Sequence, residues 1–242
     1  MKPFAAAAPT ASRLGGARAG AASPSNAARG ADAAADREFA ALLVRIRACR
    51  ACAAQLPLGP RPIVQAAASA RLLIVGQAPG AKVHASGVPW DDASGARLRD
   101  WLGIDTATFY DASRIAIVPM GYCYPGRGRG GDLPPRRECA QLWLDRLLAG
   151  MPRIELTLLI GQYAQRHFLG ASAKASLSDT VAAFADYLPR YLPLPHPSPR
   201  NTGWFKHHPW FEREALPLLR ERVRNVLVAN DRRVVASSGA SP

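Results

Sequence analysis

The sequence has no long apolar run, and this absence excludes a membrane-spanning helix. No stretch of about 18 or more apolar residues occurs in the chain, although a bilayer span needs one. Cysteine is scarce as well, because four residues in 242 are too few for a small domain stapled by disulfides. The charged residues, 20% of the chain and mixed in sign, argue against a wholly disordered protein. The remaining class is a folded, water-exposed domain.

Acidic residues are also few relative to basic ones. The chain has 18 Asp and Glu against 31 Lys and Arg, which gives a formal net charge of +13. Most of this excess lies outside the two ends, between residues 37 and 228. A core of this charge favours a polyanionic partner, most simply nucleic acid. A generally Arg-rich composition with a solvated basic surface explains the charge equally well.

The composition divides the chain into three parts. Residues 1–36 are rich in Ala, Gly, Ser and Pro without an apolar period, which predicts a disordered extension. Residues 37–228 have the patterning of one domain, and residues 229–242 are predicted to be a flexible tail. The extension lacks the apolar segment of a secretory signal, although its Arg- and Ala-rich start is compatible with an organelle transit peptide. We favour a bacterial extension on a monomeric, cytoplasmic protein of the nucleoid.

Short apolar runs alternate with helical patterns along the domain. We expect strands over residues 71–75, 114–118, 155–160 and 191–194. We expect helices over residues 38–48, 94–102, 138–149, 162–169 and 210–227. Short apolar strands that alternate with helices are typical of a parallel sheet covered on both faces. The predicted fold class is therefore α/β, with three α/β/α layers around a central four-stranded parallel sheet.

Each predicted strand ends in a loop rich in Gly, Pro and polar residues. The loops cover residues 76–92, 119–133, 161–162 and 195–208. Ligands of open parallel sheets bind at the carboxyl ends of the strands. The same residues could serve only as turns, so position alone does not establish a site.

The four cysteines are Cys49, Cys52, Cys123 and Cys139. The C-x2-C pair can place two thiolates on one metal centre, and the other two cysteines would complete a four-sulfur site. Disulfides or free buried thiols are the alternatives, of which disulfides are rare in a reducing cytosol. The wide second spacing differs from a zinc ribbon. Spacing favours a metal site, with an iron–sulfur cluster and zinc equally compatible.

The loop motifs resemble the uracil-DNA glycosylase superfamily over residues 40–225. The motifs that carry the resemblance, in chain order, are Gly76-Gln77-Ala78-Pro79-Gly80, Gly87-Val88-Pro89-Trp90-Asp91-Asp92-Ala93-Ser94-Gly95, Pro134-Pro135-Arg136-Arg137-Glu138-Cys139 and His196-Pro197-Ser198-Pro199-Arg200-Asn201-Thr202. With the cysteines, they look like the iron–sulfur branches, families 4 and 5. The resemblance implies the fold of that superfamily and a [4Fe–4S] cluster on the four cysteines, with structural zinc as the alternative.

The second and fourth motifs look closer to family 5, and this implies roles for individual residues. Trp90 takes the place of the aromatic residue that stacks on the flipped base. Asp92 matches the carboxylate that orients or activates water, and His196 matches the histidine that faces the base carbonyl. The substrate-binding set implied by the resemblance also includes Gly76, Gln77, Ala78, Pro79, Gly80 and Asn201.

Three positions depart from the family patterns. Gln77 stands where family 4 has Glu, so no carboxylate acts from there. Pro119 stands where family 4 has a base-reading Asn, which excludes uracil selection through that amide. One residue fewer than in family 5 separates Trp90 from the carboxylate, so the role of Asp92 could shift to Asp91.

These residue types suit the cleavage of an N-glycosidic bond. A carboxylate stabilises the oxocarbenium-like sugar and positions water, and a donor at the base carbonyl stabilises the leaving anion. DNA contacts are expected from Arg200, Lys206 and His207. Asp92 could instead be a helix N-cap, and Trp90 could be ordinary core.

We therefore predict a monofunctional DNA repair glycosylase that hydrolyses the bond between the sugar and uracil, or a related deaminated base. Its partner is DNA with a damaged base. Two alternatives are a non-catalytic relative that binds DNA damage and an N-glycosidase of free nucleosides or nucleotides.

Overall fold

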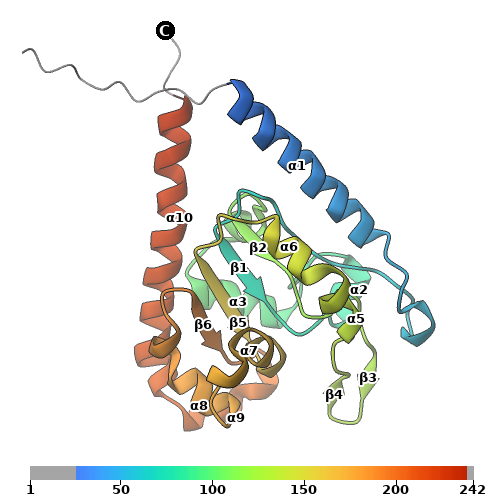
Figure 1. Cartoon of the computed structure of the whole chain (residues 1–242). Helices are drawn as coiled ribbons and strands as arrows, with labels where there is room; N and C mark the ends of the chain where they lie inside the picture. The colour runs from blue at the N-terminus through green and yellow to red at the C-terminus, as the bar shows by residue number, and fades with distance from the viewer. Residues whose placement is uncertain (1–25, 239–242) are drawn as a thin grey trace, which may run out of the picture.

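The computed structural model describes the backbone of residues 26–238 and the side chains of residues 30–228. Its centre is a parallel sheet with the strand order β2-β1-β5-β6 (Figure 1). These strands are β1 (Leu72–Val75), β2 (Ile115–Ile117), β5 (Leu156–Ile160) and β6 (Tyr191–Leu194). All four coincide with predicted strands, and the parallel pairings confirm the predicted fold class.

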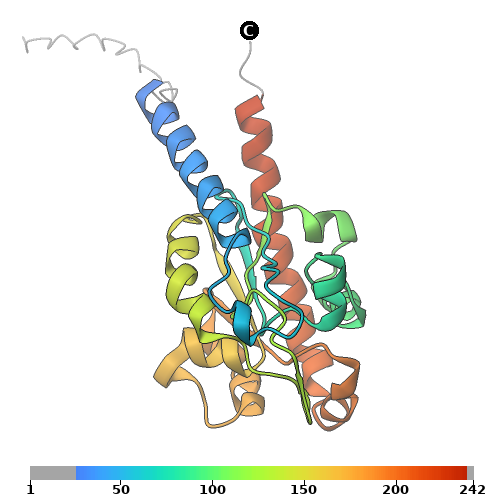
Figure 2. The ribbon, with the colours of Figure 1, turned by 90° about the vertical axis from the view of Figure 1, so that its right-hand side faces the viewer.

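The sheet is buried on both faces, which explains why its strands are apolar runs without alternation. In β1, Leu72 and Ile74 pack into one hydrophobic cluster, whereas Leu73 and Val75 pack into the other. Helices α1 (Asn26–Arg47), α6 (Asp145–Ala149) and α7 (Gln162–Leu169) contribute to the cluster of Leu73. The cluster of Leu72 includes residues of helices α3 (Ala93–Leu102), α4 (Thr106–Tyr110), α8 (Leu177–Ala182) and α10 (Leu216–Ser238). Figure 2 shows these two helical layers on either side of the sheet.

The long predicted helices are all present, with short additions that the periodicity did not indicate. The α-helices are α1 (Asn26–Arg47), α2 (Ala81–Ser86), α3 (Ala93–Leu102), α4 (Thr106–Tyr110), α5 (Arg137–Cys139), α6 (Asp145–Ala149), α7 (Gln162–Leu169), α8 (Leu177–Ala182), α9 (Thr202–His207) and α10 (Leu216–Ser238). Single turns of 3₁₀ or π geometry are η1 (Ala53–Gln55), η2 (Ala140–Leu144), η3 (Gly170–Ser172), η4 (Phe184–Tyr187), η5 (Pro199–Asn201) and η6 (Phe211–Ala215). A small antiparallel hairpin joins β3 (Arg127–Gly128) to β4 (Gly131–Asp132).

Both ends of the described chain correct the predicted boundaries. Helix α1 begins at Asn26, so the part of the predicted disordered extension between residues 26 and 36 is helical. Alanine has the highest helix propensity of all residues, which accounts for helix formation without an apolar period. Helix α10 continues to Ser238, so residues 229–238 are helical rather than a flexible tail. Residues 1–25 and 239–242, also predicted to be flexible, lie outside the described residues.

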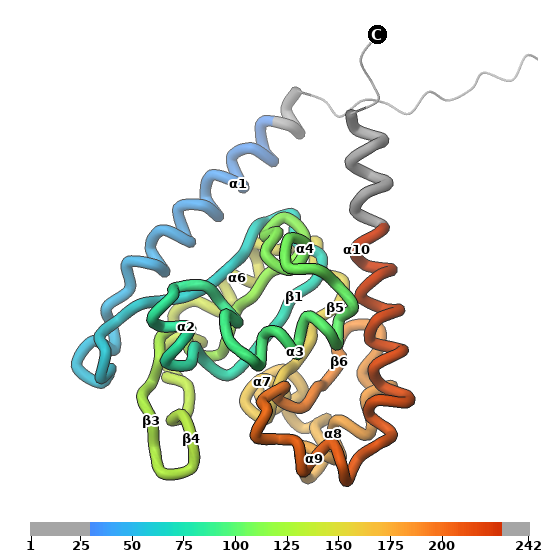
Figure 3. The backbone as a smooth tube through the Cα atoms, turned by 180° about the vertical axis from the view of Figure 1, so that it is seen from behind, coloured from blue at the N-terminus to red at the C-terminus, as the bar shows by residue number. Residues whose placement is uncertain are grey.

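Figure 3 shows α1 and α10 running away from the end of the molecule that carries the β3–β4 hairpin. No helix in the described part of the chain combines the length and the apolar character of a membrane span.

Candidate functional site

A cavity of about 600 Å³ lies at the carboxyl edge of the sheet. We call it the base cavity, and three of the four strand-end loops line it, namely those after β1, β2 and β6. Predicted site residues on its wall are Gly76, Gln77, Ala78, Pro79, Gly80, Trp90, Asp92, His196, Arg200 and Asn201. The loop after β5 contributes no lining residue, and neither do the exposed Lys206 and His207 of α9. Most of the predicted set is therefore gathered at one place.

Trp90 forms an aromatic wall of the base cavity. Its ring centroid lies 5.6 Å from that of His196, and a Cβ atom on Gly76 would lie 3.0 Å from the indole. Trp90 has a φ of 58°, the left-handed conformation that bulky residues rarely adopt. Such a conformation costs about 1–3 kcal/mol and persists only where surrounding contacts impose it. The preceding carbonyl, that of Pro89, is held by the Tyr110 hydroxyl at 3.0 Å.

Gly95 allows the Trp90 backbone to approach α3 closely. A Cβ atom on Gly95 would lie 1.7 Å from the Trp90 carbonyl oxygen, so only glycine permits this approach. We expect Gly95→Ala to lower the free energy of unfolding by at least about 1–3 kcal/mol, the usual effect of overpacking, and to displace the indole. Urea unfolding and base-release rates measure the two effects. Gly203→Ala is the control, because nothing lies within 4 Å of the Cβ it would add; equal midpoints for both variants would contradict the prediction.

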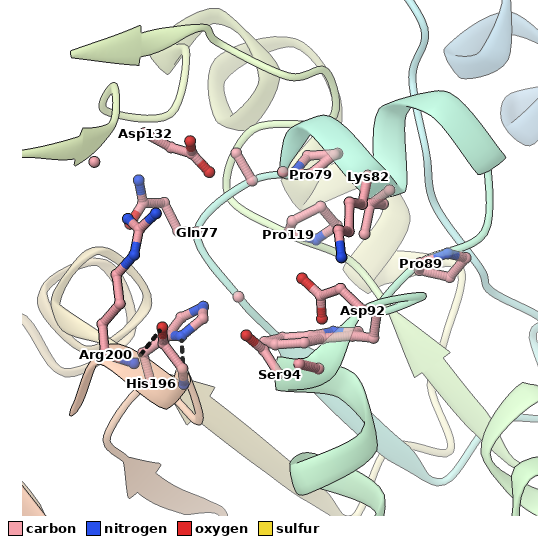
Figure 4. Close-up of a pocket in the computed structure, with 18 of the residues that line it drawn as sticks. Gln77, Pro79, Lys82, Pro89, Asp92, Ser94, Pro119, Asp132, His196 and Arg200 are labelled. Atoms are coloured by element: carbon pink, nitrogen blue, oxygen red, sulfur yellow. Dashed lines mark hydrogen bonds between the residues drawn. The ribbon is translucent and has the colours of Figure 1, made fainter. Parts of the chain in front are cut away.

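Asp92 serves both as a helix cap and as a residue of the cavity wall. It is the N-cap of α3, where its Oδ1 accepts a hydrogen bond of 2.8 Å from the Gly95 N–H. The same carboxylate lines the base cavity, and Figure 4 shows it facing Lys82 across that space. The neighbouring Asp91 is exposed and is not a lining residue. The geometry therefore favours Asp92 over Asp91 as the cavity carboxylate.

His196 follows β6 and is held in one orientation. The Ser198 backbone N–H donates to its Nδ1 at 3.2 Å (Figure 4), so a neutral ring carries its proton on Nε2. The Asn201 amide donates to the His196 carbonyl at 2.8 Å. Burial lowers the pKa of His196, whereas Asp92 and Asp132 act in the opposite direction. The ring is therefore a neutral donor at neutral pH.

The β3–β4 hairpin lies in the predicted strand-end loop 119–133 and supplies part of the cavity wall, although the sequence singled out none of its residues for the site. The Gln77 amide donates to the Leu133 carbonyl at 3.1 Å, which ties the hairpin to the loop after β1. Asp132 of the hairpin lines the cavity, as does Lys82 of α2. The only signal was the glycine-rich run from residue 126 to 131, which reads as an ordinary loop.

The four cysteines line a second, smaller cavity, which we call the cysteine cavity. They come from the turn after α1, the loop after β2 and helix α5, and none of them forms a disulfide. Burial raises the pKa of Cys139 to about 12, with a contribution from the neighbouring cysteines. As arranged in the described residues, no group of three or more His, Cys, Asp or Glu side chains could hold a metal ion. The thiols are thus gathered without converging on one point.

A comparison with protein families bears on the base cavity. The model of the uracil DNA glycosylase superfamily matches residues 64–220. This segment exceeds half of the chain and contains every lining residue of the base cavity except Ile63. The match confirms the resemblance drawn from the loop motifs and carries with it DNA binding and a glycosylase-type activity. The chain belongs to the uracil DNA glycosylase superfamily.

Proposed function

We propose that the protein removes uracil, or a related deaminated base, from DNA by hydrolysing the N-glycosidic bond. The observation that carries the proposal is that one cavity is lined by Trp90, Asp92 and His196. These groups supply a flat surface, a carboxylate and a neutral hydrogen-bond donor. An extruded nucleotide needs all three, because its base must be held while its sugar and its leaving group develop opposite charges.

In the proposed mechanism, the flipped base stacks on Trp90, an interaction worth about 1–3 kcal/mol per base. The C1′–N bond breaks with its electron pair going to the base, and the sugar becomes oxocarbenium-like. Asp92 stabilises that cation and orients the water that adds to C1′. The proton of that water passes through Asp92 to the solvent, and the released base anion takes up a proton from the solvent. The Nε2–H of His196 donates to the carbonyl oxygen of the departing base, where the negative charge collects. Pro119 offers no side-chain donor or acceptor, so the pocket recognises the base without an amide at that position.

Arg200 is placed to contact the DNA backbone beside the base cavity. It is exposed and lines the cavity rim. We expect Arg200→Ala to weaken binding of all sequences equally and to reduce the slope of log K against log salt by about 0.9, one phosphate contact. Fluorescence anisotropy between low and moderate salt measures the slope. Arg224→Ala is the matched control, because Arg224 lines a cavity with Arg114 at the amino end of β2; equal slopes for the two variants would contradict this role.

We also propose that the four cysteines hold a [4Fe–4S] cluster. A zinc site requires all four sulfurs around one ion. In a cluster each iron takes one thiolate, so the sulfurs need not converge. The side chain of Arg136 lies within hydrogen-bonding reach of Cys52, which suits an anionic group. When bound, the cluster would join the turn after α1, the loop after β2 and helix α5.

A base-release screen tests the main proposal. Duplex and single-stranded oligonucleotides with one uracil, hypoxanthine or xanthine are incubated with the holoprotein, with and without alkali afterwards. Strand breaks that need alkali are the expected result. Tight binding without release would favour a damage-binding relative, and release from free deoxyuridine alone would favour a nucleoside hydrolase; either result overturns the proposal.

A further inference from the structure

Three buried hydrogen-bond donors on the cysteine cavity have no partner among the described residues. They are the Tyr122 hydroxyl, the Trp143 Nε1–H and the Arg136 Nε–H, and all three residues line that cavity. Tyr122 is 1% exposed. An unsatisfied buried donor is destabilising, so three of them at one place point to acceptors other than the described residues.

The three residues are tied to the cysteines by position as well as by burial. Tyr122 directly precedes Cys123, and its backbone N–H donates to the Cys139 sulfur at 3.4 Å. Trp143 lies four residues after Cys139, and in helical geometry residues four apart face the same side. Arg136 pairs with Glu138 through another nitrogen and approaches Cys52. A group bound by the cysteines would therefore lie among all three donors.

The residues that line the cavity suit an anionic group with several sulfur atoms as hydrogen-bond acceptors. Apart from the cysteines, its lining consists mainly of apolar residues and these donors. Four thiolates on a [4Fe–4S]²⁺ core give a net charge of −2, and a buried anion needs charged or hydrogen-bonded partners.

We propose that Tyr122, Trp143 and Arg136 donate hydrogen bonds to the sulfur atoms of this cluster and thereby raise its reduction potential and slow its loss. The inference rests on the proposed cluster. One-electron reduction by an added reductant takes the core from 2+ to 1+ and makes the group more negative. Donors stabilise the reduced form more than the oxidised form, which is why they raise the potential.

The experiment compares the holoprotein with Tyr122→Phe, Trp143→Phe and Arg136→Gln, all purified without oxygen. Midpoint potentials are measured by titration with dithionite under EPR detection, and iron release to a chelator is followed in air. We expect each variant to have a lower potential. For Tyr122→Phe, the ratio of reduced to oxidised cluster at a fixed potential should fall about tenfold, which corresponds to about 59 mV for one electron. Iron release should become several-fold faster.

Tyr187→Phe is the matched control, because the Tyr187 hydroxyl donates to the exposed Ser172 carbonyl at 2.9 Å and lies outside the cysteine cavity. Its potential and release rate should equal those of the wild type. If the wild type carries a cluster and all three variants have its potential and its rate of iron release, the donor proposal alone is overturned. A wild type that holds zinc, or no iron and sulfide, would overturn the cluster as well, while base release is scored separately. If a variant does not bind the cluster, the iron–sulfur Raman bands of the wild type are compared in H₂O and D₂O. The absence of a shift would contradict hydrogen bonds to sulfur.

Discussion

Asp92→Asn is expected to lower the rate of base release by about 10²- to 10⁴-fold, the usual contribution of a general acid or base. The substitution removes the negative charge that stabilises the sugar cation in the proposed mechanism, yet the amide oxygen still accepts the hydrogen bond of the Gly95 N–H. Asn and Asp cap helices equally well, so the fold and DNA binding should be retained. Single-turnover assays measure the rate, and anisotropy measures binding.

Two further variants separate chemistry from capping. Asp92→Ala removes both the charge and the cap, so it should lose activity and also about 1 kcal/mol of stability. Asp91→Asn changes an exposed carboxylate outside the cavity wall and should leave the rate unchanged. If Asp91→Asn lowers the rate of base release and Asp92→Asn leaves it unchanged, the carboxylate role belongs to Asp91.

His196→Gln is expected to lower the rate of base release by about 10²- to 10³-fold, as for the loss of one donor at a developing anion. The glutamine side chain is flexible and is not held by the Ser198 N–H, which now fixes the ring through Nδ1. Because the imidazole acts as a neutral donor in the proposed mechanism, activity should not require its protonation between pH 7 and 8. A wild-type rate that falls over this interval, with a normal rate in His196→Gln, would contradict the role.

The lowered pKa of His196 also has a consequence for stability. The unfolded histidine binds a proton below its ordinary pKa of 6.5, whereas the half-buried ring of the folded protein resists protonation until a lower pH. The unfolded state therefore binds more protons in that interval, and the free energy of unfolding should fall as the pH drops below about 6.5. Urea unfolding from pH 7.5 to 5 measures the slope, which should be shallower in His196→Gln.

The sheet was predictable because its strands are apolar runs that end in Gly and Pro. This pattern alone was enough to predict β1 and β5. The loops after β1, β2 and β6 lie together because the carboxyl ends of parallel strands are at the same edge of the sheet. The gathering of Trp90 and His196 follows from that rule. The cysteines also line one cavity despite their separation in the sequence, since Cys123 follows β2 and Cys139 lies in α5.

Features that depend on few residues were not predictable. The β3–β4 hairpin has two residues in each strand, too few for an alternation to register, so the loop 119–133 was predicted but its strands and the position of Asp132 came only from the structure. Asn201 was assigned to the substrate but holds the His196 backbone as well. Lys82 lies in α2, a helix of six residues that is too short to display a period.

The Trp90 indole fits against one glycine while its backbone fits against another, Gly76 and Gly95. Positions 76 and 95 therefore both contact residue 90, and the effects of substitutions at these three positions should be strongly non-additive. Libraries that aim to widen the range of accepted lesions should vary residues 76, 90 and 95 together, because randomising the tryptophan alone samples only side chains that suit the existing left-handed backbone.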